Sequence, residues 1–146
     1  MKKKWAFRIY VLVLTCLLFA RPWMSLPENY CAHLRLHSNL QPFGTIMLYF
    51  NLILHDFGPF LRVVALVNLL GNVLIFVPMG HYLAKRFSLW QGVFIGLLML
   101  IFIELTQWIT LTGSLDIDDI LLNLTGILIG FALKRQKIPL DNPPQP

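Results

Sequence analysis

The sequence predicts an all-α integral membrane protein with four transmembrane helices, one short interfacial or re-entrant segment, and both termini in the cytoplasm. The composition is the first reason: 57% of the 146 residues are hydrophobic and 13% are charged, whereas soluble domains average about 45–50% and about 25%. The mean hydropathy is +0.67. The second reason is the distribution of basic residues, which form clusters separated by segments poor in Lys and Arg. That distribution is typical of membrane orientation and does not indicate a nucleic-acid-binding surface.

The first predicted span covers residues 5–20, directly after a basic N-terminal cluster. A charged segment followed by an apolar run also fits a signal peptide, but Arg21-Pro22-Trp23 follows in place of a small-x-small cleavage site. We therefore expect an uncleaved helix, in which the long side chain of Arg8 extends its charge to the membrane interface.

Two pairs of potential ligands near the N-terminus are interpreted as ordinary side chains. His33 and His37 are spaced i, i+4 in a polar loop at 21–42, but no third ligand lies nearby, so we expect a solvated pair. Cys16 lies in the apolar run and Cys31 in the loop, so we expect two free thiols. The sequence therefore predicts no metal site and no cofactor.

Residues 43–54 form a mainly apolar segment that is too short to cross a bilayer, so we expect an interfacial or re-entrant element. Residues 63–84 form the second span. Its Asn68 and Asn72 lie one helical turn apart and share a face. Pro78 frees a backbone carbonyl inside this span, which a neighbouring helix must cover.

The third span is predicted at 89–109. Gly92 and Gly96 form a small-xxx-small pair at its start, which favours close helix contact. Glu104 and Gln107 share a face near its end. A turn without basic residues then leads to the fourth span, predicted at 117–133.

Asp116 and Asp118 stand at the beginning of the fourth span. They either cap the helix, where negative charge suits the helix dipole, or belong to a functional site. Further along the same helix, Gly126 and Gly130 would let another backbone approach closely.

The basic residues set the predicted topology. With the N-terminus in the cytoplasm, four spans place nine of the twelve Lys and Arg residues inside and only Arg21, Arg35 and Arg62 outside. The membrane domain is expected to cover 1–137, and the proline-rich residues 138–146 are expected to form a disordered tail.

Polar side chains of the last three spans fall at one depth. At a rise of about 1.5 Å per residue, this topology places them within roughly 15 Å of the outer surface. Amides often bond neighbouring helices, but a carboxylate costs roughly 2.5–3.5 kcal/mol on membrane-insertion scales. Glu104 is therefore the strongest functional candidate, and Asp119 follows it. We expect one outward-facing polar cluster that binds a ligand, without assigned catalytic residues, formed by Asn68, Asn72, Glu104, Gln107, Asp116, Asp119 and Asn123.

Three blocks of residues resemble the VanZ-like family of membrane proteins. They are Asn68-x-x-x-Asn72-x-x-x-Phe76-x-Pro78-x-Gly80, Glu104-x-x-Gln107, and Asp116-Ile-Asp118-Asp119-x-x-x-Asn123-x-x-Gly126-x-x-x-Gly130. Asn39-Leu-Gln-Pro42-Phe43 is also similar to the family's outer loop. Many members carry an arginine just before the first aspartate, where this chain has Gly113-Ser114-Leu115. The resemblance implies a bacterial cell-envelope protein, and the named member of the family is associated with teicoplanin resistance.

Three functions from different classes remain open on the sequence. The polar pocket could engage a lipid-linked cell-wall precursor or a lipoglycopeptide and lower susceptibility to teicoplanin-type compounds. Alternatively, Glu104 and Asp119 could act as an acid/base pair or hold a divalent metal in an intramembrane enzyme that modifies a lipid-linked head group. A channel or transporter would require a homo-oligomer with a continuous polar path. The expected partners are thus the lipid bilayer and an envelope ligand, and no nucleic acid.

Overall fold

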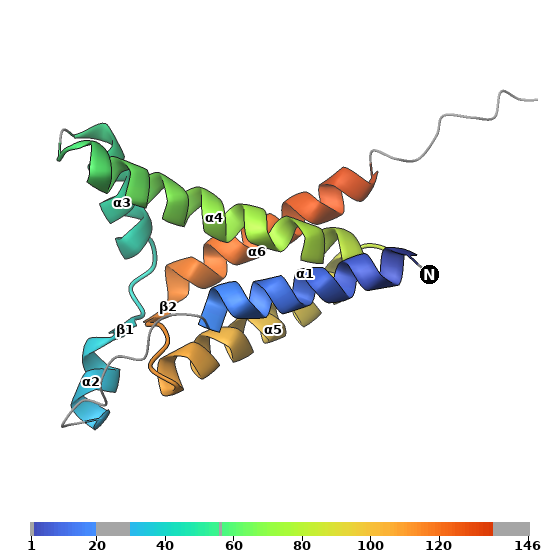
Figure 1. Cartoon of the computed structure of the whole chain (residues 1–146), viewed down its shortest axis with the longest axis horizontal. Helices are drawn as coiled ribbons and strands as arrows, with labels where there is room; N and C mark the ends of the chain where they lie inside the picture. The colour runs from blue at the N-terminus through green and yellow to red at the C-terminus, as the bar shows by residue number, and fades with distance from the viewer. Residues whose placement is uncertain (1, 20–29, 56, 136–146) are drawn as a thin grey trace, which may run out of the picture.

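The computed structural model describes residues 2–19, 30–55 and 57–135, and this part of the chain is almost entirely helical (Figure 1). The all-α prediction is confirmed. The predicted tail at 138–146 lies outside the described residues. The elements are α1 (Lys2–Phe19), α2 (Tyr30–Leu36), β1 (Ser38–Asn39), α3 (Gly44–Leu54), α4 (Pro59–Leu83), α5 (Leu89–Ile109), β2 (Leu115–Asp116) and α6 (Ile117–Arg135).

Two of these helices, α4 and α5, are long and apolar enough to cross a membrane. Helix α5 covers the residues predicted for the third span. Helix α4 begins at Pro59 instead of at residue 63, because proline suits the first helical turn, where its missing N–H is not needed. Helix α1 contributes a shorter apolar stretch, Trp5–Phe19, and α6 begins with two aspartates and ends with Lys134-Arg135. The full four-span arrangement therefore stays a prediction.

Large apolar side chains cover the outer faces of α4 and α5. Phe60, Leu74, Trp90, Phe94 and Phe102 are between 62% and 81% exposed. So many exposed large apolar side chains are unusual for a soluble protein. These helices therefore present the kind of surface that suits contact with lipid.

Helices α4 and α6 run in the parallel sense and cross each other (Figure 1). They approach closely at the crossing because glycines leave no side chains between the two backbones. A Cβ atom on Gly126 would lie 2.1 Å from the carbonyl oxygen of Val73, and one on Gly130 would lie 2.3 Å from that of Val77. The prediction that these glycines admit another backbone is confirmed, and the backbone they admit is that of α4.

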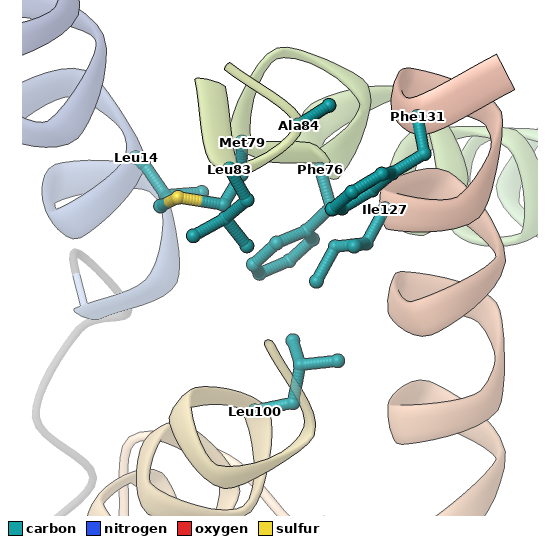
Figure 2. Packing of buried hydrophobic residues seen from close by; sticks show 8 residues of the cluster. All are labelled: Leu14, Phe76, Met79, Leu83, Ala84, Leu100, Ile127 and Phe131. Atoms are coloured by element: carbon teal, nitrogen blue, oxygen red, sulfur yellow. The ribbon is translucent and has the colours of Figure 1, made fainter. Parts of the chain in front are cut away.

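Helix α5 packs against the other side of α6 in the antiparallel sense. A Cβ atom on Gly92 would lie 2.1 Å from the ring of Phe131, and one on Gly96 would lie 2.8 Å from the side chain of Ile127. The predicted close contact at these two glycines is confirmed, and here it is made by side chains. The side chains of Ile127 and Phe131 belong to a cluster of buried residues, which Figure 2 shows: Leu14, Phe76, Met79, Leu83, Ala84, Leu100, Ile127 and Phe131.

Helix α1 covers α4 near its internal proline. The Tyr10 hydroxyl donates a hydrogen bond of 2.7 Å to the carbonyl of Ile75, which is next to the carbonyl that Pro78 leaves without an N–H partner. One turn earlier, the ring of Phe7 stacks on Tyr82 with centroids 3.4 Å apart. A neighbouring helix thus supplies a donor where the proline interrupts the hydrogen-bond ladder.

Candidate functional site

The loop before α3 and the beginning of α6 form one hydrogen-bonded unit. Strands β1 and β2 pair in parallel, with Ser38 opposite Leu115 and Asn39 opposite Asp116. The N–H of Leu115 also donates to the carbonyl of His37 at 2.9 Å. This short pairing places the loop at 39–45 against the first turn of α6. The sequence predicts a polar loop at 21–42 and a turn before the fourth span, whereas the structure has α2 and β1 in the first of these segments and β2 at the end of the second.

Asp116 is buried and binds both sides of this junction. Its Oδ1 accepts the N–H of Asp118 at 2.9 Å, which is the geometry of an N-cap on α6. Its Oδ2 accepts the Thr45 hydroxyl at 2.5 Å and is 3.5 Å from Nδ2 of Asn39. The capping interpretation of Asp116 is confirmed, and the same carboxylate also holds the loop.

Asp118 is fully buried and caps a different helix from its own. Its Oδ1 accepts the N–H of Phe43 at 2.6 Å and its Oδ2 accepts the N–H of Ile46 at 3.0 Å. These amides lie at the N-terminus of α3, where Phe43 is the N-cap residue and adopts a left-handed backbone with φ 65°. A bulky residue in that conformation is strained, so the carboxylate fixes an unfavourable turn as well as a helix end.

A second polar link joins α4 and α6. The amide Nδ2 of Asn72 donates to Oδ1 of Asp119 at 2.6 Å. Asn68 shares the helix face but donates to the carbonyl of Val64 in its own helix at 2.8 Å. The structure therefore brings Asn72 and Asp119 together and does not give Asn68 the same role.

Glu104 and Asn123 are both 3% exposed and face the interior from α5 and α6. Helices α5 and α6 are antiparallel, and Gly96 lies against Ile127. Glu104, eight residues after Gly96, is therefore level with Asp119, eight residues before Ile127. The amide oxygen Oδ1 of Asn123 is buried and accepts no hydrogen bond within the described part of the chain. A hydrogen-bond acceptor thus remains available in the interior at this level.

Gln107 lies further along α5 and has a different partner. Its Nε2 donates to the carbonyl of Leu18 at 2.8 Å, so it ties α5 to the end of α1. Asp118, Asn39 and Thr45 were not among the predicted site residues, although they complete the junction. The signal available for the loop was its similarity to a known outer loop at Asn39–Phe43.

Two further predictions concern metal ligands and thiols. Cys16 and Cys31 are free and exposed, as predicted. Among residues 2–19, 30–55 and 57–135, no three His, Cys, Asp or Glu side chains gather closely enough to hold a metal ion.

The chain is similar to a known protein family. A family model described as VanZ/LLP1 matches residues 7–136. The match covers most of α1, all of α4, α5 and α6, and the loop at 39–45. No curated protein and no solved structure matches the chain.

Proposed function

Because the chain belongs to the VanZ/LLP1 family, we propose that it is a multi-pass protein of the bacterial cell membrane that lowers susceptibility to teicoplanin-type lipoglycopeptides. Two helices long and apolar enough to span support the membrane location. The association of the family's named member with teicoplanin resistance supports the phenotype. The ligand is a lipoglycopeptide or the lipid-linked cell-wall precursor that such compounds recognise.

The observation that carries the proposal is the burial of Glu104 and Asn123 between helices with apolar outer faces. A carboxylate and an amide are costly in such surroundings, and purely adhesive contacts between helices can be made with smaller groups. Asn123 adds a buried acceptor oxygen that has no hydrogen-bond donor in the described residues. We infer that these groups, together with Asp119, bind a ligand that brings its own hydrogen-bond donors.

The two other carboxylates of the junction have a supporting role. Asp116 and Asp118 fix the loop and α3, and α3 exposes Met47, Leu48 and Leu54. An apolar helix of this kind lies naturally in the membrane interface. We interpret α3 as the predicted interfacial segment, placed beside the site where the lipid tail of a ligand would arrive.

A complementation experiment tests this function. A deletion strain receives the wild-type gene, Glu104→Gln, Asp119→Asn or Thr125→Val, and each strain is scored for teicoplanin tolerance and for the membrane level of the protein. Thr125 is the matched control, because it is exposed on α6 and bonds only the carbonyl of Leu121 in its own helix. We expect Glu104→Gln and Asp119→Asn to fall to the tolerance of the deletion strain at normal membrane levels. Full tolerance in both variants would contradict the proposal.

The second candidate is an intramembrane enzyme that modifies a lipid-linked head group. The level positions of Glu104 and Asp119 on neighbouring helices favour it, because two carboxylates can divide acid and base roles. Mass spectrometry of envelope lipids separates the two functions. A head-group change that requires the wild-type gene and disappears in Glu104→Gln would favour the enzyme, whereas lost tolerance with an unchanged lipid profile favours ligand binding.

A further inference from the structure

A cavity of about 490 Å³ lies at the opposite end of α6 from the carboxylate junction. Lys134 follows Asp119 by fifteen residues, which corresponds to about 22 Å along the helix. The cavity is therefore separate from the proposed ligand site. The residues that line it are Ala84, Phe87, Leu89, Leu128, Phe131, Ala132 and Lys134.

The walls of this cavity are apolar and come from three helix ends. Phe131 is 8% exposed and its ring is packed against Gly92, so it forms a fixed inner wall. Figure 2 shows Phe131 extending from α6 into the buried cluster. Leu89 and Leu128 are partly open to the outside. The volume lies within the roughly 300–1,000 Å³ of typical small-molecule sites, and the lining suits a hydrocarbon chain.

The mouth of the cavity is cationic. Lys134 donates through Nζ to the carbonyl of Ala84 at the end of α4, and because an ammonium group has three donors, two remain for another acceptor. Lys85 and Arg86 follow Ala84 in the turn to α5 and are exposed. The guanidinium of Arg86 is held 3.9 Å over the ring of Tyr82. An anionic group is therefore attracted to the same place as an apolar chain.

We propose that this cavity binds an anionic phospholipid, with an acyl chain against Leu128 and Phe131 and the phosphate at Lys134. The basic turn at Lys85-Arg86 belongs to the end of the helices that the positive-inside rule assigns to the cytoplasmic leaflet. Basic pockets between helices on that side of a membrane bind anionic head groups. The lipid would fill the space between α4, α5 and α6 and bridge the turn to the end of α6.

Native mass spectrometry of the full-length protein in mild detergent tests the proposal, with phosphatidylglycerol and phosphatidylcholine of identical acyl chains as probes. Ala132→Phe fills the cavity, and its control is Leu133→Phe, at an exposed neighbouring position that does not line it. Lys134→Gln removes the charge but keeps an N–H donor for Ala84. Its control is Arg35→Gln, which removes an exposed charge from α2.

We expect the wild type and both controls to retain phosphatidylglycerol more strongly than phosphatidylcholine. Ala132→Phe should lose bound lipid of both kinds, and Lys134→Gln should show a clearly weaker preference for phosphatidylglycerol, because only Lys85 and Arg86 remain at the mouth. Circular dichroism and gel filtration verify the fold, and if Ala132→Phe does not fold, the smaller Ala132→Leu replaces it. The proposal is overturned if the wild type shows no preference or if Lys134→Gln keeps the full wild-type preference. It is also overturned if the cavity-filling variant binds lipid as its control does, or if a dimer forms that excludes lipid.

Discussion

Replacing Asp118 by Asn tests whether a carboxylate on α6 holds α3 in place. The carboxylate accepts the N–H groups of Phe43 and Ile46 at 2.6 and 3.0 Å. Asparagine keeps the shape but offers one acceptor oxygen, and its NH₂ group would face a backbone donor. Losing one hydrogen bond to a charged group removes about 1.5–3 kcal/mol, and the amide left without a partner adds about 1–3 kcal/mol.

The free energy of opening α3 should therefore fall by about 3 kcal/mol or more. Helix α3 has 11 residues, fewer than the roughly 12–15 at which isolated helices become marginally stable, so its stability depends on its cap and on its packing against α4. A loss of about 3 kcal/mol corresponds to a more than 100-fold increase in the opening equilibrium, at tenfold per roughly 1.4 kcal/mol.

Hydrogen exchange of the protein in detergent micelles, followed by mass spectrometry, measures this opening. Peptides covering 43–54 should exchange about 100-fold faster in Asp118→Asn than in the wild type, while peptides from α5 should be unchanged. Thr125→Val is the control on the same helix, because its hydroxyl bonds only its own helix. Wild-type exchange of 43–54 in Asp118→Asn would refute the capping role.

Three further predictions concern the helix contacts. Gly126→Ala should lower the unfolding free energy by about 1–3 kcal/mol, because its Cβ would meet a backbone oxygen of α4. Gly71→Ala, which has open space around it, should instead raise the unfolding free energy by up to about 1 kcal/mol. Equal effects of the two variants in an SDS unfolding titration would contradict this prediction. A double-mutant cycle of Asn72→Ala and Asp119→Ala should give a coupling energy of about 0.6–1.7 kcal/mol, and zero coupling would mean that the 2.6 Å contact does not form. Gln107→Leu should lower thermal stability by the equivalent of about 1–2 kcal/mol, since a carbonyl of α1 loses its donor, and an unchanged melting temperature would count against that link.

Helix positions and helix contacts could be predicted from the sequence because both follow from local patterns. Apolar runs located α4 and α5, and the spacing of Gly126 and Gly130 identified a surface that meets another backbone. The partner of Asp118 could not be predicted. Its acceptor oxygens bind amides 72 and 75 residues away, and no periodicity along the chain relates α6 to the start of α3.

Asn68 and Asn72 lie on the same face of α4 but bond different partners. Residues four apart share a face, but whether a side chain reaches a neighbour depends on how far away that neighbour is. Figure 1 shows α4 and α6 diverging from their crossing toward the ends that carry α3 and β2. Asn72 is close enough to the crossing to bond Asp119, whereas Asn68, one turn further out, bonds its own helix.

The adjacent residues Asp118 and Asp119 connect the apolar helix α3 to the proposed site. Consecutive positions on a helix point about 100° apart, so these two carboxylates serve two neighbours: Asp118 holds α3 and Asp119 holds α4 through Asn72. A ligand that displaces α3 on the membrane surface must therefore act on the same helical turn that carries Asp119. Asp118→Asn should then reduce teicoplanin tolerance, although both carboxylate oxygens of Asp118 are already bound to the N–H groups of Phe43 and Ile46 and are not offered to the ligand. A variant in which α3 loses its hydrogen-exchange protection while tolerance stays complete would show that α3 and the site work independently.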